Sequence, residues 1–305
     1  MFPIIPANSA TAASGPNDEG VFGFGNDGSG IVSMTNLVSN TGVVASDVAG
    51  AGTARSSLMA TEYGGDKGIF AYGYDGTPYI SVTNLVSNAG IVASDAAGAG
   101  TARGSGAGCH YGTDKGLFAF GSPKTGVSNL ISNTGVVSSD VAAVGQARGD
   151  LGGCEYGEDK GIFGYGERSG GWTTTVSNLV SNTGVIASDV TSPGQKRQQT
   201  CACSYGEDKG IFGYGVDSDT STKYSVTNLV SNVGVVSSDV SGVGQIRISL
   251  SACEYGQDKG IFGFGWLTPT YYAITNLVSN TGVVASDQAA TTGTARRALA
   301  ACSFN

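Results

Sequence analysis

The chain has 305 residues and a formal net charge of −8 at pH 7, and only 13% of its residues are charged. Binding to a phosphate backbone needs a clustered basic surface, so we expect no nucleic-acid partner. The chain has no run of 18 apolar residues, so we expect no membrane insertion. Glycine supplies 50 residues, and these recur at regular positions, which indicates turns and not low-complexity disorder.

Residues 1–17 are expected to form an extended N-terminal arm. Pro3, Pro6 and Pro16 stand among alanine, serine and threonine, a composition typical of weakly structured segments. No basic region precedes the apolar residues of the arm, so we expect no cleavable signal peptide. We expect the arm to contact partner proteins and residues 18–305 to form one domain.

A segment of eight residues, Asp159 to Gly166, organises that domain because it returns with small changes six times. Its copies begin at Asp18, Asp66, Asp114, Asp159, Asp208 and Asp258. A period of about 45–50 residues is typical of propellers, solenoids and repeat arrays.

Each repeat contains four short apolar segments, which in the second repeat are residues 55–63, 68–73, 80–88 and 91–95. Aromatic and β-branched residues between glycines indicate strands, and the Asn-Ala-Gly or Asn-Thr-Gly turn joins the last two as a hairpin. Four strands in about 50 residues, without a helical period, are typical of one propeller blade. We therefore predict an all-β fold, a six-bladed β-propeller of four-stranded blades.

The two ends of the domain predict how the ring closes. The first repeat begins at Asp18 with its second segment, and the chain ends with residues 296–304, which match a first segment. We expect this C-terminal strand to complete the N-terminal blade, so that no sheet edge is left at the seam.

The arginine before the first strand and the Gly164-Tyr165-Gly166 end of the second strand resemble the kelch repeat. Units such as Thr-Asn-Leu-Val-Ser-Asn-Thr-Gly-Val-Val-Ala-Ser-Asp are similar to glycine-rich repeats of phage tail-fibre-like virion proteins. The first resemblance implies that the first strand of each blade lies nearest a central channel and the fourth at the rim. The second implies a virion component, assembled in the host cytoplasm.

One basic residue precedes the first strand in every repeat. These structural repeat positions are Arg55, Arg103, Arg148, Arg197, Arg247 and Arg296. A residue present in every blade is explained by a need that every blade shares. We expect each arginine to bind turn carbonyls or a nearby aspartate through its planar donors; the alternative is an arginine ring facing an anionic ligand in the channel.

Five cysteines also share one position, namely Cys109, Cys154, Cys203, Cys253 and Cys302. We expect small buried thiols without disulfides; a cysteine ring that binds metal is the alternative, weakened by the lack of a histidine cluster. The sequence therefore predicts no metal site and no cofactor. The one histidine, His110, is expected to be an exposed strand residue.

The sequence offers no catalytic residue, so we expect no enzyme. No Gly-X-Ser-X-Gly motif accompanies His110, and no phosphate-binding loop occurs. The alternative enzyme would use carboxylates at the channel mouth, with Asp217 and Glu167 as candidates.

What differs between repeats is the loop after the second segment. These loops are residues 26–30, 74–78, 122–126, 167–172, 216–223 and 266–270. The aromatic residues in or beside them are Tyr74, Tyr79, Trp172, Tyr224, Trp266, Tyr271 and Tyr272. We expect them to gather on one face, where they would stack on sugars or anchor a protein; the alternative is that they only cap the blade edges.

The leading interpretation is a non-catalytic structural and adhesive virion module. Its arm would contact other virion proteins, and its loop face would bind a cell-surface glycan or protein receptor. The alternative is a free lectin-like or protein-binding propeller in the cytoplasm.

Overall fold

The computed structural model describes residues 18–142, 144–288 and 293–304, so the expected N-terminal arm lies outside the described residues. In this part of the chain every regular element is a β-strand, as the sequence predicts. None of the described residues forms a helix that could cross a lipid bilayer.

Six antiparallel sheets of similar construction follow one another along the chain. In the second repeat the sheet order is β3 (Met59–Tyr63), β4 (Lys67–Ala71) and β5 (Thr83–Val86). The third and fourth repeats supply β6 (Ala107–Tyr111), β7 (Lys115–Ala119), β8 (Ser128–Ile131), β10 (Gly152–Tyr156), β11 (Lys160–Gly164), β13 (Val176–Val180) and β14 (Val190–Thr191). The fifth and sixth supply β15 (Cys201–Tyr205), β16 (Lys209–Asp217), β17 (Thr222–Val230), β18 (Ser251–Tyr255), β19 (Lys259–Gly263) and β22 (Thr275–Val278). Two small two-stranded sheets pair β9 (Arg148–Gly149) with β12 (Glu167–Arg168) and β20 (Trp266–Leu267) with β21 (Thr270–Tyr271).

The N-terminal sheet contains the two ends of the domain. Its order is β2 (Ile31–Val38), β1 (Glu19–Asn26) and β23 (Ala300–Phe304). Val21 of β1 pairs with Cys302 of β23 in an antiparallel register. The prediction that the C-terminal strand joins the first sheet is confirmed.

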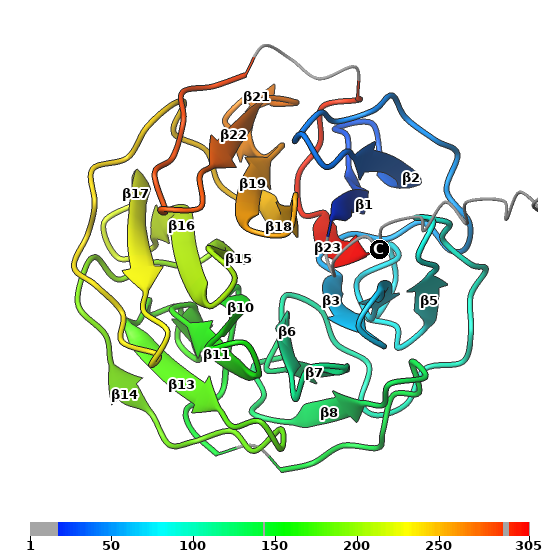
Figure 1. Cartoon of the computed structure of the whole chain (residues 1–305), viewed down its shortest axis with the longest axis horizontal. Coiled ribbons are helices and arrows are strands. Elements are labelled where there is room, and N and C mark those ends of the chain that lie inside the picture. Colours follow the sequence, from blue (N-terminus) through cyan, green and yellow to red (C-terminus); the bar gives the residue numbers. More distant parts are fainter. Residues whose placement is uncertain (1–17, 143, 289–292, 305) are drawn as a thin grey trace, which may run out of the picture.

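The first strand of each sheet contacts the first strands of both neighbouring sheets. The succession of contacts runs from β23 to β3, β6, β10, β15 and β18, and from β18 back to β23. Figure 1 shows these six strands nearest the middle of the molecule, with the third strands outside them. We call them the inner strands.

The fourth segment of the repeat differs from the expected continuous strand. In the second repeat it makes the isolated bridges Val86 to Val92 and Thr83 to Ala96. Among the described residues, only the fourth repeat adds a named strand, β14, which directly follows this segment and extends the sheet. A side-chain hydrogen bond interrupts the strand pairing here. The side-chain amide of Asn84 donates to Ala93 O at 2.9 Å, so this carbonyl does not accept from a backbone N–H of the neighbouring strand.

Aromatic side chains join successive sheets. The second strand is buried on both faces, so it is a run of apolar residues such as Ile69, Phe70 and Ala71, all 0% exposed. Phe70 packs edge-on against Phe24 of the preceding sheet, with ring centres 5.2 Å apart. Phe24 has a φ of 62°, unusual for a bulky residue, and aromatic residues hold this conformation at the same point of all six repeats.

The cysteines fill a second contact between sheets. All six thiols are buried and free, so the expectation of small buried thiols is confirmed. Cys302 packs on Gly68 so closely that a Cβ on that glycine would lie 2.4 Å from the sulfur. Burial in this contact raises the pKa of the Cys302 thiol well above its ordinary value.

Candidate functional site

A row of four hollows follows the inner strands from end to end. The first and last have volumes of about 410 and 350 Å³, and the two between them measure about 110 and 40 Å³. We call the row the central channel. The wide end lined by Ser57 and its equivalents is the loop mouth, and the end lined by Glu62 and its equivalents is the acidic mouth.

A ring of residues in the left-handed conformation surrounds the loop mouth. They are Ser57, Ser105, Asp150, Gln199, Ser249 and Ala298, with φ between 52° and 58°. Backbone bonds join them around the ring: Ser57 N donates to Ala298 O, Ser105 N to Ser57 O, Asp150 N to Ser105 O, Gln199 N to Asp150 O, and Ala298 N to Ser249 O, at 2.6–2.8 Å. The sixth pair is joined by Ser249 Oγ, which donates to Gln199 Oε1 at 2.9 Å. Because backbone groups hold the ring, the side chains can differ from repeat to repeat.

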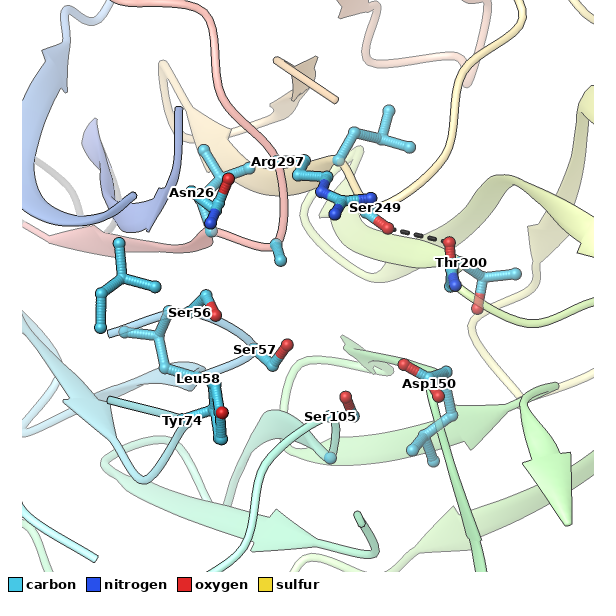
Figure 2. A pocket seen from close by; sticks show the side chains of 17 residues that line it. Asn26, Ser56, Ser57, Leu58, Tyr74, Ser105, Asp150, Thr200, Ser249 and Arg297 are labelled. Atoms are coloured by element: carbon cyan, nitrogen blue, oxygen red, sulfur yellow. Dashed lines mark hydrogen bonds between the residues drawn. The ribbon is translucent and has the colours of Figure 1, made fainter. Parts of the chain in front are cut away.

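The loop mouth combines repeated serine and leucine side chains with polar side chains that occur in one repeat only (Figure 2). Asn26 and Arg297 stand along one edge of the hollow, and Tyr74 and Asp150 stand across it from them. Burial raises the pKa of Asp150, although Lys124 at 3.4 Å opposes that shift. The mouth therefore offers hydroxyl, amide, carboxyl and guanidinium groups around a single hollow.

The structure brings only some of the predicted aromatic residues to this mouth. Tyr74, 40% exposed, lines the hollow and packs on Tyr79. Arg297 also lines it, and its guanidinium lies 4.4 Å from the ring centre of Trp266. Trp266 in turn packs on Tyr271 at 6.4 Å.

The other three predicted aromatics lie elsewhere. Trp172, 55% exposed, lines a separate hollow with Arg168 and Gln146. The hydroxyl of Tyr224 donates to Gln195 Oε1 at 3.5 Å. Tyr272 is partly buried, and its backbone N–H donates to Gly265 O. The predicted aromatics therefore do not share one hollow: two loops each pack a pair of their own rings, and Trp172 lines a different hollow.

The six repeated arginines are wholly buried and lie between successive sheets. Arg55 Nε donates to Tyr72 O at 2.8 Å, and its Nη2 donates to Asn84 Oδ1 at 2.6 Å. The guanidinium also lies 4.2 Å from the ring centre of Phe24, in the preceding sheet. Burial lowers the pKa of Arg55 to about 10, with Asp95 opposing the shift, so the side chain stays charged at neutral pH.

These are contacts of the kind expected for a structural arginine. The same stacking recurs at Arg103, Arg148, Arg197, Arg247 and Arg296, each 4.0–4.7 Å from an aromatic ring centre. Each of the six is 0% exposed. The alternative of an arginine ring facing a channel ligand is inconsistent with that burial.

His110 is only 7% exposed, so the expectation of an exposed strand residue is wrong. Alignment of the repeats places His110 at the same position as Glu62, Glu155 and Glu254, polar residues that are usually exposed to solvent on a strand. In the fold this position faces the acidic mouth, where six inner strands converge and cover it. The burial of His110 follows from the convergence of the strands in the fold, so the sequence alone did not predict it.

The two carboxylates considered for an enzyme are held by other protein groups. Asp217 is 4% exposed and accepts from Thr173 Oγ1 at 2.7 Å. Burial pushes its pKa up, but the hydrogen bonds from Thr173 and the backbone of Asp219 outweigh it and the pKa is lowered. Glu167 pairs with Lys124 at 2.8 Å. Neither of the two has the arrangement of a free acid or base in a hollow.

Comparison with known proteins found no family model that matches the chain and no similar sequence among curated proteins.

Proposed function

We propose that the chain is a closed six-bladed β-propeller with the inner strands around its channel. Six successive sheets, a closed succession of contacts between inner strands, and the pairing of β1 with β23 support this arrangement. Closure leaves no sheet edge at the seam between the two ends of the domain.

We propose further that this propeller is a non-catalytic adhesive module that binds its partner at the loop mouth. The observation that carries the proposal is the contrast between a strictly repeated frame and a mouth that carries unique side chains, such as Asp150, Gln199 and Arg297, beside repeated serines and leucines. A hollow of about 410 Å³ lies in the range of small-ligand sites, which are about 300–1,000 Å³. An asymmetric lining on a repeated frame favours recognition of one asymmetric ligand.

The chemistry of the mouth favours a sugar unit of a cell-surface glycan. Sugars present hydroxyls for groups such as Asp150 and Gln199, and flat C–H faces for an exposed ring such as Tyr74. The guanidinium of Arg297, fixed on Trp266, adds planar donors. A protein receptor is the second ligand class, since exposed tyrosine and arginine also anchor protein interfaces.

The setting we propose is a virion tail or fibre, supported by the resemblance of the repeats to tail-fibre-like proteins. In that setting residues 1–17 contact other virion proteins and the loop mouth contacts the receptor. A free lectin-like propeller in the cytoplasm is the alternative, in which the same mouth binds its ligand without assembly.

A glycan-array screen of the full chain tests the binding proposal, with light scattering to measure its oligomeric state. We expect Tyr74→Ala and Arg297→Ala to abolish specific glycan binding. Trp172→Ala is the matched control, because it removes a more exposed ring from a separate hollow, and we expect it to retain binding. Equal losses in all three variants, or no binding in the native chain, would contradict a glycan site at the loop mouth.

Removal of residues 2–17 separates the two settings. If the virion setting is right, the truncated chain keeps its ligand but loses association with partner proteins. A native chain that is monomeric and binds fully, with no partner that depends on the arm, would support the free lectin.

A further inference from the structure

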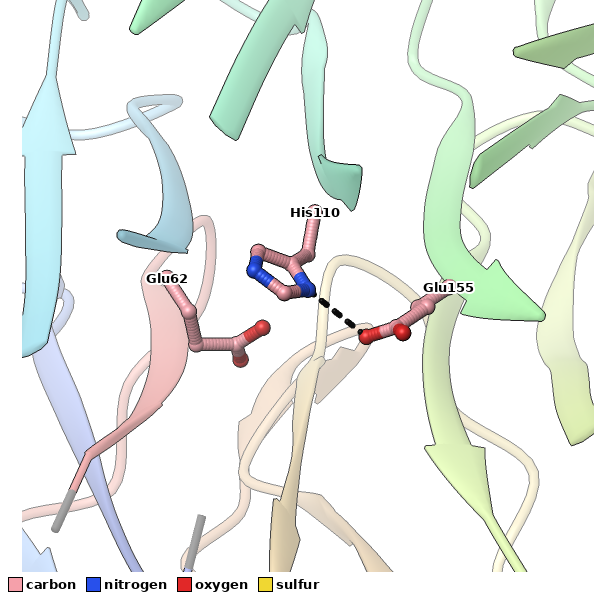
Figure 3. A group of neighbouring side chains, drawn as sticks. All are labelled: Glu62, His110 and Glu155. Carbon is pink, nitrogen blue, oxygen red and sulfur yellow. Dashed lines mark hydrogen bonds and ion pairs between the residues drawn. The ribbon is translucent and has the colours of Figure 1, made fainter. Parts of the chain in front are cut away.

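The acidic mouth holds a compact group of three ionisable side chains from three neighbouring inner strands. Glu62 lies on β3, His110 on β6 and Glu155 on β10, all at the same position of their repeats. Figure 3 shows the imidazole between the two carboxylates, with Glu155 on the side of Nδ1. No residue of the loop mouth takes part, so this group is independent of the binding site proposed above.

The geometry of the group is that of potential metal ligands. His110 Nδ1 lies 2.9 Å from Glu155 Oε2. One nitrogen of His110 and one oxygen from each glutamate lie within 4.8 Å of one another. The side chains of His110 and Glu155 are only 8% and 12% exposed, which keeps water from competing freely for these atoms.

A second observation points to a missing ligand. The imidazole of His110 is more than nine-tenths buried, yet its Nε2 atom has no hydrogen-bond partner among the described residues. A buried polar atom left without a partner costs about 1–3 kcal/mol. Such an atom in a cluster with two carboxylates is explained if a bound ligand occupies the space between them.

We propose that Glu62, His110 and Glu155 form a binding site for a divalent transition-metal ion, with Zn²⁺ as the fitting ion. Imidazole nitrogen with carboxylate oxygen is a ligand set that Zn²⁺ accepts, whereas Mg²⁺ and Ca²⁺ prefer oxygen alone. Two carboxylates also balance the charge of the ion.

The observed separations are close to those that zinc requires. Tetrahedral zinc with bonds of about 2.0–2.2 Å holds its ligand atoms about 3.3 Å apart. The candidate ligand atoms, one from each residue, lie within 4.8 Å of one another and reach that value by small side-chain rotations. The adjoining hollow of about 350 Å³ admits water as the remaining ligand.

Protons compete with the ion for His110. Burial lowers the pKa of His110, but the hydrogen bond and charge of Glu155 and the charge of Glu62 outweigh it and the pKa is raised. The other titratable groups around this mouth are Asp114 after β6, Glu158 after β10, Glu207 after β15, Glu254 on β18 and the buried thiol of Cys109. Zinc binding displaces the imidazole proton, so affinity must rise with pH as His110 loses it.

Titration calorimetry of the chelator-treated full chain with Zn²⁺ tests the proposal. We expect one ion per chain, and at least a tenfold loss of affinity in Glu62→Gln, His110→Gln and Glu155→Gln. Glu254→Gln is the matched control, since it removes one carboxylate from the same position of another inner strand and leaves the three ligands in place. We expect its affinity to change less than threefold.

Co²⁺ supplies a second readout that does not depend on any variant folding. We expect visible d–d absorption bands in the native chain without a sulfur-to-metal charge-transfer band, because the six thiols take no part. The repeats carry glutamate, serine or histidine at this position, so glutamine should be tolerated, and melting curves check this. No uptake of either ion, unchanged affinity in His110→Gln, or an equal loss in Glu254→Gln would each overturn the proposal.

Discussion

The guanidinium of Arg55 lies 4.2 Å from the ring centre of Phe24, which belongs to the preceding sheet. The same arginine donates to Tyr72 O and to Asn84 Oδ1 in its own sheet. One side chain therefore joins two sheets through a cation–π contact on one side and hydrogen bonds on the other. The contact repeats around the molecule, which makes the arginines the first place to test stability.

We expect Arg55→Met to lower the free energy of unfolding by about 3–5 kcal/mol, because it leaves buried acceptors without their charged donor. Arg148→Met tests whether the loss of stability follows the number of hydrogen bonds that the arginine makes. Nη2 of Arg148 has no hydrogen-bond partner among the described residues, so its loss should cost less than that of Arg55. Denaturant unfolding of both variants measures the difference; no loss in either would contradict the structural role.

The contact between Gly68 and Cys302 predicts a double-mutant cycle. Gly68→Ala places a Cβ only 2.4 Å from Cys302 Sγ, while the next nearest atoms are 3.4 Å from that Cβ. We expect a loss of about 1–3 kcal/mol from this overpacking. Cys302→Ala removes the sulfur, so the double variant should recover most of the loss that Gly68→Ala adds. Additive losses in urea unfolding would show that the clash lies elsewhere.

Asp95 predicts how stability depends on pH. Burial raises its pKa, but hydrogen bonds from Thr53 and Asn84 and the charge of Arg55 outweigh it and the pKa is lowered. The native state therefore binds this proton more weakly than the unfolded chain. The stabilisation is present above the unfolded pKa of about 3.9 and is lost as pH falls through the folded value.

We expect Asp95→Asn to be less stable than the native chain by about 1 kcal/mol at pH 7, because solvent screens this exposed carboxylate and weakens its hydrogen bonds. The gap should narrow as pH falls below about 4. Thermal melts from pH 7 to pH 2.5 measure it, and a gap that is independent of pH would contradict the assignment.

Deletion of residues 300–305 removes β23 and leaves β1 without one of its partners. Because β23 also contacts β3 and β18, we expect loss of cooperative unfolding in the whole chain and not only in the first sheet. A synthetic peptide of residues 299–305, added in excess, should restore a cooperative melt. A truncated chain that melts as the native one does would argue against closure through this strand.

The repeat pattern was enough to predict the β-class, the buried thiols and the pairing of the C-terminal strand. Each depends on side chains that recur at one position, as Cys302 and Arg296 do. The fourth segment was overestimated because apolar alternation cannot reveal that Asn84 takes Ala93 O with its side chain. The burial of His110 was not predicted for another reason: it arises only where neighbouring inner strands meet at the acidic mouth.

The loop aromatics were expected to gather, but they do not line one shared hollow. Tyr74 reaches the loop mouth, but Trp172 lines another hollow. The loops differ in length and in their turns, so a shared position in the repeat does not fix where a ring points. The repeated arginines and cysteines could be placed from the sequence, whereas the side chains on unique loops could not.

The backbone ring at the loop mouth has a consequence for how such a protein diversifies. Five of its links use only main-chain groups that every residue type except proline supplies. Ser57, Ser105 and Ala298 could be exchanged for other residues that accept a positive φ without altering the circumference of the opening. Related proteins with this backbone ring can therefore change their ligand specificity without changing the shape of the opening. A library randomised at these positions is a practical starting point for new binders.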